Sequence, residues 1–321
     1  MNVEQREIIE LQRRMLEHSL GSRLERLARR CAPVWEEKVV LDRVLARWLD
    51  RIPYCRLVYA MDARGVQISA NVFVDSLQHE MLGQDLSRRP YFQDGLARHG
   101  FALSQVYISS VTRRPCLTAV QAVSRHEGTL GWVAADFELR DLPLLQATCR
   151  PDRGRQAING DPVIRNVFQA QQRVESPMDR HMDDVVAIVE ELVCERGVFH
   201  AKLHFSGSRA TLWLLDDPYH YRIHLMDEIL DPSLCLAYRR RPYPARPAVG
   251  PAQVRAVLTG LARLRLGDER YYLRSGSLNV MNGLVGLTFS SDGSQYLTAE
   301  AFLEADLDTR GAAGPGEAVA G

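Results

Sequence analysis

Histidine side chains are concentrated in one part of the sequence, where their spacing could support metal chemistry. His200 and His204 are four residues apart, as are His220 and His224, and His181 precedes them on a predicted helix. Imidazoles on adjacent strands can together bind a transition metal. Residues four apart on one strand, however, share a face but lie about 13 Å from each other at about 3.3 Å per residue. Only histidines on neighbouring strands could share an ion, so we predict no metal ligand and no cofactor from the spacing alone.

Acidic pairs and a basic run occur in the same part of the chain. Asp216-Asp217 and Asp227-Glu228 could supply acid and base groups, but a solvated turn and the start of a helix explain them equally well. The run Arg239–Arg241 has the composition of an exposed loop that could touch a phosphate or an acidic partner. The sequence has no Walker loop, no G-x-S-x-G and no H-E-x-x-H motif. We therefore predict no catalytic residues and no enzymatic activity.

The most clearly marked elements lie between residues 57 and 139. The apolar run Leu57–Tyr59 is followed by the turn-forming segment Asp62–Gly65, after which Val66 and Ile68 alternate as in a half-buried strand. Gly65 supplies the positive φ that such a turn demands. These residues predict a β-hairpin.

A helix and three strands are predicted after this hairpin. Ser87 can cap the helix, Pro90 suits its first turn, His99-Gly100 would end it, and Phe92 and Leu96 would share one side. Residues 102–110, 116–124 and 129–139 are strand-like, and the turns between them are too short for a crossover helix, so they are expected to pair as an antiparallel meander. The segment is predicted to form a five-stranded antiparallel sheet with helices on one face, within an α+β chain.

Ordered motifs in this segment resemble those of the Cache family of sensor domains, also described as PDC-type sensor domains. They are D-x-x-G-V-Q-I-S, G-x-D-L-S-x-R-P-Y-F, S-x-V-Y-I-S, a turn with Arg-Pro, and G-W-V-A-A-D-F-E-L. The resemblance covers roughly residues 36–145, under half of the chain. It implies a PAS-like sheet and the ligand-binding role that such domains have in bacterial chemoreceptors and sensor kinases.

The resemblance also implies a set of ligand-binding residues. Amino-acid-binding members use an Arg-Pro-Trp-Tyr stretch on the helix, a tyrosine on the next strand and an aspartate on the last strand. Arg89 matches the arginine, Tyr107 the strand tyrosine and Asp136 the aspartate. A guanidinium can form paired hydrogen bonds with a ligand carboxylate, and the Asp136 carboxylate could hold an ammonium group.

The chain departs from the family pattern at neighbouring positions. Tyr91 stands where the family usually has tryptophan, Phe92 replaces a tyrosine, and Ser109 occupies a position where a second acid is often found. These departures weaken the amine half of the site, so an amino acid, a small carboxylate or no ligand at all stay open. In the alternative interpretation, Arg89 and Asp136 form a structural ion pair and Tyr107 packs in the sheet.

Composition and charge give a soluble globular protein of ordinary type. The chain has 321 residues, which favours two domains, and its 46% hydrophobic and 25% charged residues are typical of such proteins. Forty basic and forty acidic side chains cancel, so nothing indicates a nucleic-acid or membrane partner. The six cysteines are scattered without zinc-like spacing, which predicts reduced thiols.

The N-terminal region carries a helical pattern rather than a signal sequence. Its first 20 residues lack the apolar core of a signal peptide, and no run in the chain approaches the roughly 20 apolar residues that span a bilayer. We therefore expect a cytoplasmic location, unlike most members of the resembled family. The apolar residues predicted to share one face of a helix over residues 3–31 are Ile8, Leu11, Met15, Leu20, Leu24, Leu27 and Cys31.

That apolar stripe needs a partner surface. It either pairs with its copy in a homodimer or docks on its own domain. Pro33 is expected to end the helix, and a second helix is predicted for Val34–Leu49. The predicted organisation is an N-terminal amphipathic helix over residues 1–35 and a Cache domain over residues 36–145.

The remainder is predicted to form a linker, a second domain and a tail. Residues 146–177 have little periodicity and are expected to be a linker with one short helix near Val163–Gln171. Residues 178–306 are predicted to form a C-terminal α+β domain with antiparallel strands. Residues 307–321 are small and polar, which predicts a disordered tail.

Three hypotheses for the function remain open at this point. The preferred one is a bacterial sensory or regulatory protein whose Cache domain binds a small metabolite and signals through the C-terminal domain or a partner protein. The second is a metal-binding or enzymatic C-terminal domain built around the histidine-bearing strands. The third is an interaction scaffold whose sensor pocket has degenerated.

Overall fold

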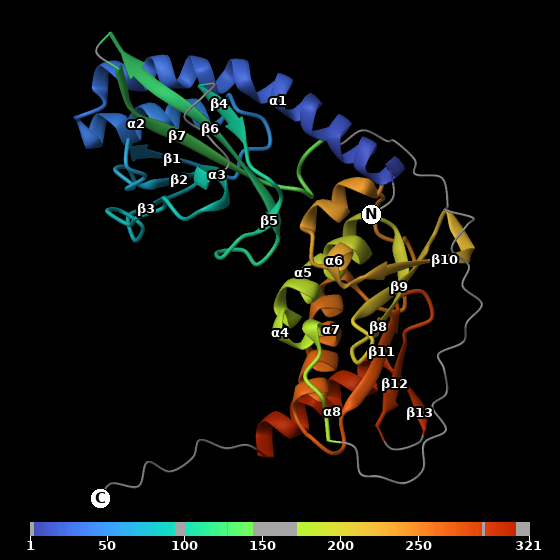
Figure 1. The fold of residues 1–321 in the computed structure, drawn as a ribbon. Coiled ribbons are helices and arrows are strands. Elements are labelled where there is room, and N and C mark those ends of the chain that lie inside the picture. The colour runs from blue at the N-terminus through green and yellow to red at the C-terminus, as the bar shows by residue number, and fades with distance from the viewer. Residues whose placement is uncertain (1–2, 94–99, 127, 144–171, 291–292, 313–321) are drawn as a thin grey trace, which may run out of the picture. The chain divides into compact units, whose positions relative to one another are not determined.

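The computed structural model describes residues 3–93, 100–126, 128–143, 172–290 and 293–312 (Figure 1). They fall into two compact units, one within Asn2–Ala147 together with Pro232–Ala237, the other within Thr148–Asp231 and Tyr238–Gly321. Each unit has one antiparallel sheet with helices packed against it, which confirms the predicted α+β class. Within the described ranges, no helix has the length and apolar character needed to cross a membrane.

Helices α1 (Val3–Cys31) and α2 (Lys38–Leu49) open the first unit and are joined by the 3-10 turn η1 (Ala32–Val34). Pro33 lies in that turn, as expected for a residue that cannot continue the ladder of helical hydrogen bonds. Both helices pack against the sheet of their own unit. The long helix predicted as a separate segment is therefore part of the first unit, docked on its own domain.

The buried face of α1 differs from the predicted one in its first half. Ile9 and Leu16 are buried, whereas Leu11 and Met15 are 42% and 44% exposed. Steps of three or four residues back from Leu20 lead to Leu16, Gln12, Ile9 and Gln5, all of which are buried. The apolar pattern did not predict this face because two of its members are glutamines.

The first sheet has seven strands in the order β3-β2-β1-β7-β6-β4, with β5 also paired to β6. They are β1 (Leu57–Asp62), β2 (Asn71–Phe73), β3 (Leu77–Gln78), β4 (Phe101–Leu103), β5 (Tyr107–Ile108), β6 (Pro115–Arg125) and β7 (Gly128–Glu138). Five strands were predicted. The predicted strand 102–110 is divided into β4 and β5, because the amide of Thr118 donates a hydrogen bond of 2.9 Å to the hydroxyl of Ser104 rather than to a backbone carbonyl. The other additional strand is β3, a short strand at the edge of the sheet.

The predicted hairpin is also interrupted. Val66 and Gln67 form only isolated bridges, and the strand that pairs along β1 is Asn71–Phe73. The Ser69 hydroxyl accepts a hydrogen bond of 2.7 Å from the amide of Ala60, so a side chain replaces a backbone partner at this point. The short helix α3 (Pro90–Gln93) starts at Pro90 as predicted, and its predicted continuation through Leu96 to His99 lies outside the described residues.

The two faces of the first sheet have different coverings. Helices α1 and α2 pack on one face (Figure 1). The other face carries Leu57, Tyr59 and Met61 of β1, which form a buried cluster with Leu86 and Tyr91 from the segment that follows the hairpin. This second face holds the candidate site.

Gly131 in β7 occupies a position where no side chain fits. A Cβ there would stand 2.2 Å from the carbonyl oxygen of Met61 and 2.6 Å from the ring of Trp35. Gly131→Ala is expected to lower the free energy of unfolding by about 1–3 kcal/mol, because these neighbours must move. Gly21→Ala in α1, where the nearest atom is 3.9 Å away, is expected to raise it by about 1 kcal/mol. Urea unfolding measures both, and a Gly131→Ala variant as stable as the wild type would contradict the packing argument.

The second unit repeats one pattern of a helix followed by three strands. Its elements are α4 (Pro177–Arg180), α5 (Met182–Glu195), β8 (Val198–His204), β9 (Arg209–Leu214), β10 (Asp217–Leu225), α6 (Met226–Ile229), α7 (Pro251–Leu266), β11 (Leu273–Asn279), β12 (Leu284–Phe289), β13 (Ser294–Thr298) and α8 (Ala299–Ala312), and η3 (Pro232–Ala237) groups with the first unit. The strand order is β10-β9-β8-β11-β12-β13. β8 and β11, the first strands of their halves, therefore form the centre of the sheet.

A helix in the linker before this unit and a disordered tail after it were predicted. The predicted linker helix near Val163–Gln171 lies outside the described residues. The tail was predicted to be disordered from residue 307, but helix α8 continues to Ala312. The apolar residues before position 307 gave no indication that the helix extends into the polar segment.

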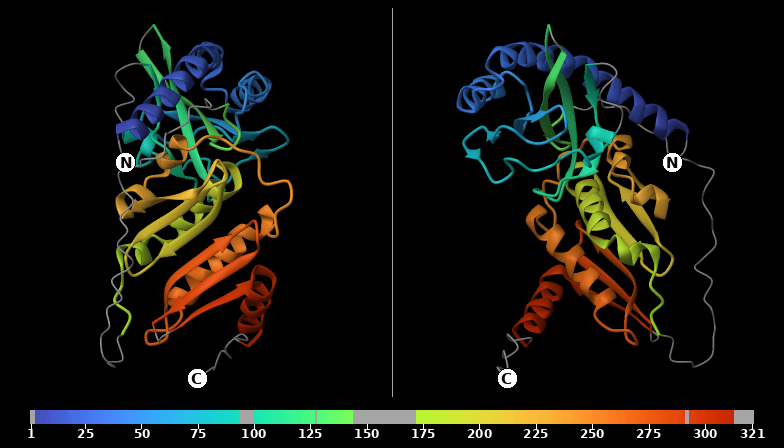
Figure 2. Two further views of the ribbon diagram at one scale, coloured as in Figure 1. Left: turned by 90° about the vertical axis from the view of Figure 1, so that its right-hand side faces the viewer. Right: turned by 60° about the vertical axis from the view of Figure 1, so that its left-hand side comes forward.

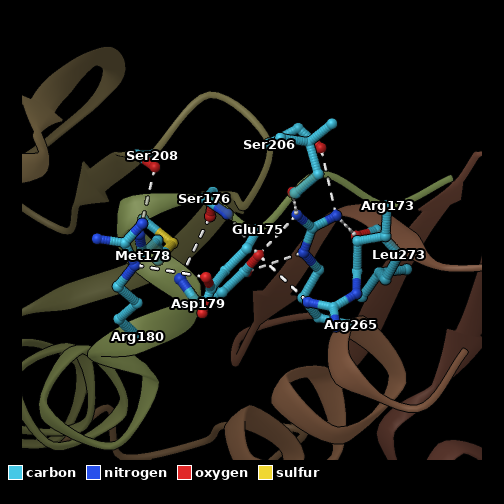
Figure 3. Close-up of polar contacts among 11 residues, drawn as sticks. Arg173, Glu175, Ser176, Met178, Asp179, Arg180, Ser206, Ser208, Arg265 and Leu273 are labelled. Carbon is cyan, nitrogen blue, oxygen red and sulfur yellow. Dashed lines mark hydrogen bonds and ion pairs between the residues drawn. The ribbon is translucent and has the colours of Figure 1, made fainter. Parts of the chain in front are cut away.

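A buried ion pair fixes the start of the second unit (Figure 3). Arg265 of α7 donates two hydrogen bonds, of 2.9 and 2.8 Å, to the two carboxylate oxygens of Asp179 in α4. The guanidinium also donates to the carbonyl oxygen of Leu273 at 3.2 Å. Ser176 caps α4 through a reciprocal pair of hydrogen bonds with Asp179. One buried guanidinium thus connects the first helix of the unit, α7 and β11.

Candidate functional site

The residues singled out by the sequence gather around one pocket in the first unit. The pocket has a cavity volume of about 50 Å³. It is lined by Arg89, Tyr91, Tyr107, Ser109 and Asp136, the complete predicted set. The structure thus brings all five together, from the loop before α3, from α3, from the β5 region and from β7.

Asp136 of β7 is one of the residues that line this pocket. The Thr118 hydroxyl donates a hydrogen bond of 2.7 Å to Oδ1 of Asp136. The hydroxyls of Thr118 and Tyr107 are also 2.7 Å apart. β6 lies between β7 and β5 in the sheet, so these three side chains come from three adjacent strands. The carboxylate is fixed on one side and lines the pocket on the other.

The carboxyl group of Asp136 is held in a poorly solvated environment. Burial raises its pKa from 3.8 to about 6, although the hydrogen bond from Thr118 and the charge of Arg89 act in the opposite direction. Its negative charge also contributes to raising the pKa of Tyr59, Tyr91 and Tyr107, after burial, which is the larger cause. A ligand cation beside Asp136 would replace the solvation that the pocket withholds.

Three tyrosine side chains, those of Tyr59, Tyr91 and Tyr107, also line the pocket. The Tyr59 hydroxyl donates a hydrogen bond of 2.8 Å to the hydroxyl of Tyr91. The rings of Tyr91 and Tyr107 are tilted against each other with their centres 6.4 Å apart. Tyr59 and Tyr91 are buried, so their rings belong to the core as well as to the pocket. Such walls restrict the pocket to a small ligand.

Arg89 lines the pocket from the segment before α3. Its Nη1 donates to the Ser110 hydroxyl at 3.3 Å, and the side chain is only partly buried. In the described residues no ion pair joins Arg89 and Asp136, so the two charges do not form the structural pair considered as an alternative. Tyr107 both packs against the buried cluster and lines the pocket, so its two interpretations are compatible.

Several lining residues could not be found from the sequence. Gln67 and Asn71 are buried lining residues joined by a hydrogen bond of 2.9 Å between their side chains. Gln67 belongs to the D-x-x-G-V-Q-I-S motif, which indicated a hairpin and no ligand-binding role, and Asn71 follows that motif. The sequence placed Tyr59 in a strand and gave it no role in the pocket. Because Tyr59 and Leu57 are two residues apart on β1, both lie on the face that holds the pocket.

The histidines of the second unit are separated by the fold. His200 and His204 share one face of β8, as their spacing predicts, but His200 stacks on Trp213 and His204 contacts the Thr211 hydroxyl. His224 is buried and its Nδ1 is 2.8 Å from the Glu228 carboxylate. Over the described parts of the chain, no three histidine, cysteine or acidic side chains gather as metal ligands.

Comparisons with known proteins add little to this description. No protein-family model matches the chain, and no curated protein sequence matches it. Similar solved structures include the ligand-binding domain of the Campylobacter jejuni chemoreceptor Tlp3 in complex with 4-methylisoleucine, at 12% identity over 43% of this chain and 61% of that chain, with a TM-score of 0.31. The ligand-binding domain of the Pseudomonas fluorescens chemoreceptor CtaA in complex with L-alanine is similar at 17% identity, over 42% of this chain and 56% of that chain, with a TM-score of 0.32.

An extracellular ligand binding receptor from Desulfohalobium retbaense is similar at 12% identity, over 44% of this chain and 26% of that chain, with a TM-score of 0.32. The chain therefore covers between about a quarter and three fifths of the length of these structures. These identities and TM-scores are low.

Proposed function

We propose that the pocket of the first unit binds a small metabolite with a carboxylate and an ammonium group, such as an amino acid, and that the protein is a sensory or regulatory protein. The observation that carries this proposal is the placement of a guanidinium and a poorly solvated carboxylate around one pocket with aromatic walls. Oppositely charged groups in a small pocket match a zwitterion. The resemblance of the sequence to Cache sensor domains supports the same conclusion.

In this proposal Arg89 receives the ligand carboxylate through paired hydrogen bonds, because a guanidinium offers parallel donors. Asp136 receives the ammonium group, and Tyr107 and Ser109 contribute hydroxyl groups beside it. Tyr91 closes the side of the pocket. A ligand that is only a carboxylate would use Arg89 and leave Asp136 protonated or solvated.

The proposed signal is a shift between two conformations of the first unit. A ligand changes such an equilibrium only by the difference in its affinity for the two states. Arg89 directly precedes α3, so a bound carboxylate would hold the start of that helix against the sheet. The second unit or a partner protein would then respond to the position of α3.

A thermal-shift screen against amino acids, short carboxylates, amines and purines tests the proposal. A ligand at a hundred times its Kd is expected to stabilise the protein by about 2.7 kcal/mol. Titration calorimetry then measures Kd for each compound that raises Tm. Arg89→Ala and Asp136→Ala are expected to weaken the binding of a zwitterion by at least about tenfold each, because each removes one charged partner.

Two matched variants serve as controls. Arg88→Ala removes the exposed neighbour of Arg89, and Asp75→Ala removes an exposed aspartate of the same unit. Both should bind the ligand as the wild type does. Binding that survives Asp136→Ala but not Arg89→Ala would identify a carboxylate ligand without an amine. The absence of any shift with the whole panel would contradict a working pocket and favour the scaffold hypothesis.

A further inference from the structure

Two buried side-chain amides that line the pocket are joined to each other. Nε2 of Gln67 donates a hydrogen bond of 2.9 Å to Oδ1 of Asn71 and another of 3.0 Å to the carbonyl oxygen of Ser69. Gln67 is 2% exposed and Asn71 is 8% exposed, and both are pocket-lining residues. We call these two residues the amide pair.

The hydrogen bonds determine which atoms of the amide pair are already used. A backbone carbonyl oxygen can only accept, so the contact with Ser69 fixes the orientation of the Gln67 amide, and the second N–H of Gln67 then fixes that of Asn71. Both hydrogens on Nε2 of Gln67 are therefore engaged. Oε1 of Gln67 and Nδ2 of Asn71 form no hydrogen bond within the part of the chain that the structure describes. The amide pair thus offers a ligand one acceptor oxygen and one NH2 donor.

The backbone beside the amide pair is held in place without a ligand. The amide of Gln67 donates a hydrogen bond of 2.9 Å to the carbonyl oxygen of Gln84, and the amide of Gly83 donates one of 2.8 Å to the carbonyl oxygen of Gln67. Met81 and Leu86, on either side of these two residues, supply apolar lining to the same pocket. A ligand therefore meets a donor and an acceptor that are already positioned, which lowers the entropic cost of binding.

The amide pair is separated from Asp136 across the sheet. β1 lies between β2, which carries Asn71, and β7, which carries Asp136, and the blue-to-green part of Figure 2 shows this sheet from two further directions. Leu57 of β1 is in register with Asp136, and the pairing of β1 with β2, continued by one residue, places Asn71 beside Tyr59. Asn71 is thus two strands across and two residues along from Asp136. This corresponds to about 12 Å between their Cα atoms at about 4.8 Å per strand and about 3.3 Å per residue.

We propose that the amide pair determines the specificity of the pocket, and that it selects an amino acid whose side chain ends in a primary carboxamide. The assignment rests on the proposed function, in which Asp136 receives the ammonium group of the ligand. The carboxamide oxygen would accept a hydrogen bond from Nδ2 of Asn71, and its NH2 group would donate one to Oε1 of Gln67, so every donor meets an acceptor.

The separation across the sheet matches the length of glutamine. Side chains stand roughly perpendicular to a sheet, so the polar atoms of Asp136 and Asn71 are separated by about the same 12 Å as their Cα atoms. The amine nitrogen and the carboxamide group of an extended glutamine are about 6 Å apart by standard bond lengths. A hydrogen bond of about 2.9 Å at each end spans the remainder.

Other side chains of this length lack one or both of the matching groups. A hydrocarbon side chain would leave the acceptor of Gln67 and the donor of Asn71 buried without partners. A carboxylate would place an acceptor against Oε1 of Gln67. A buried polar group without a partner weakens binding by roughly tenfold to a hundredfold. The amide pair therefore acts against these ligands as well as in favour of a carboxamide.

Titration calorimetry of the full chain with L-glutamine, L-glutamate, L-norleucine and L-alanine tests the proposal. L-Glutamine is expected to bind at least about tenfold more tightly than L-glutamate and L-norleucine, which have its length without its donor and acceptor groups. The side chain of L-alanine does not reach the amide pair, so L-alanine reports only on the groups that bind the ligand ammonium and carboxylate.

Asn71→Leu replaces the amide of Asn71 by a hydrocarbon of similar shape. It should weaken the binding of L-glutamine by at least about tenfold and leave that of L-alanine unchanged, which would show that the variant is folded. Gln78→Leu is the matched control, because Gln78 is the exposed residue in register with Asn71 on β3, and it should bind all four compounds as the wild type does. The comparison of ligands on the unaltered chain does not depend on how Asn71→Leu folds.

Two results would overturn the specificity and leave the proposed function intact. The first is L-norleucine or L-glutamate binding as tightly as L-glutamine, since water would then satisfy the amide pair. The second is a preference for L-glutamine that Asn71→Leu does not change. If L-glutamine does not bind at all, the specificity is wrong, and L-alanine together with the wider panel of compounds then decides whether the proposed function is wrong as well.

Discussion

Replacing Arg265 by methionine is expected to lower the free energy of unfolding of the second unit by about 3–5 kcal/mol. The side chains of Arg265 and Asp179 are 0% and 1% exposed, so removal of the guanidinium takes two hydrogen bonds from a buried carboxylate and leaves Arg173, whose Nη1 is 3.5 Å away, as its cationic partner. Burial alone would raise the pKa of Asp179, and the hydrogen bonds from Arg265 help to hold it below its ordinary value. The carbonyl oxygens of Val174 and Leu273 would also lose a donor.

Hydrogen exchange on peptides of β8 and β11 measures this loss within the unit itself. Arg263→Ala, on the exposed side of the same helix, is the matched control and should change the stability by no more than about 0.5 kcal/mol. The double variant Arg265→Met/Asp179→Leu should be more stable than Arg265→Met, because both charges are then absent. If the single and double variants were equally unstable, lost packing rather than the uncompensated charge would explain the effect.

Asp136→Asn is expected to stabilise the ligand-free first unit at neutral pH. The folded-state pKa of Asp136 is about 6, above the value of 3.8 for an exposed aspartate, so the native state binds this proton more tightly than the unfolded state. The stability that the folded state gains from binding this proton is therefore fully present below about pH 4. It is lost as the pH rises through the folded-state pKa of about 6. A difference of about two pKa units corresponds to at most about 3 kcal/mol.

The measurement compares wild type and variant by urea unfolding at pH 4, 5, 6 and 7, with hydrogen exchange of β1 and β7 as the local readout. Asp136→Asn should have nearly the stability of the wild type at pH 4 and exceed it by about 2–3 kcal/mol at pH 7. Asp75→Asn, an exposed change in the same unit, should show no such trend. A difference that does not vary with pH would contradict this prediction, because it would mean that Asp136 has the same pKa in the folded and unfolded states.

The first unit was largely predictable because its elements carry strong local patterns. The spacing of apolar residues and Pro33 predicted α1 and the break after it, and the turns around Arg114 and Gly128 predicted the β6–β7 hairpin. The failures occurred where a side chain replaces a backbone partner. Ser69 interrupts the first hairpin and Ser104 divides the strand before β6, and neither serine differs in sequence from an ordinary strand residue.

The candidate site was predictable for the residues that belong to ordered motifs. Arg89, Tyr107 and Asp136 come from three segments far apart in the sequence, and the resemblance to a family grouped them before their positions were known. The resemblance assigned no role to Gln67, although it lies in a motif, or to Asn71, because their place in the pocket depends on how the segment after β1 folds back. Whether the grouped residues bind a ligand stays a prediction.

The second unit shows the opposite balance. Its helices and antiparallel strands were predicted, but nothing local indicates that β8 pairs with β11. That pairing determines which residues share a face across the sheet. Consequently, the separation of His224 from His200 could be recognised only in the structure.

The central pairing of β8 with β11 also has a consequence for how the second unit folds. Within each half, successive strands are joined by short turns, so these hairpins can form on the microsecond timescale. The two halves meet through the pairing of β8 with β11 and the packing of α5 against α7. The long segment between β10 and β11 must bring the halves together before these contacts compensate the lost entropy. Formation of the two hairpin pairs should therefore be fast and local, and their docking should set the folding rate.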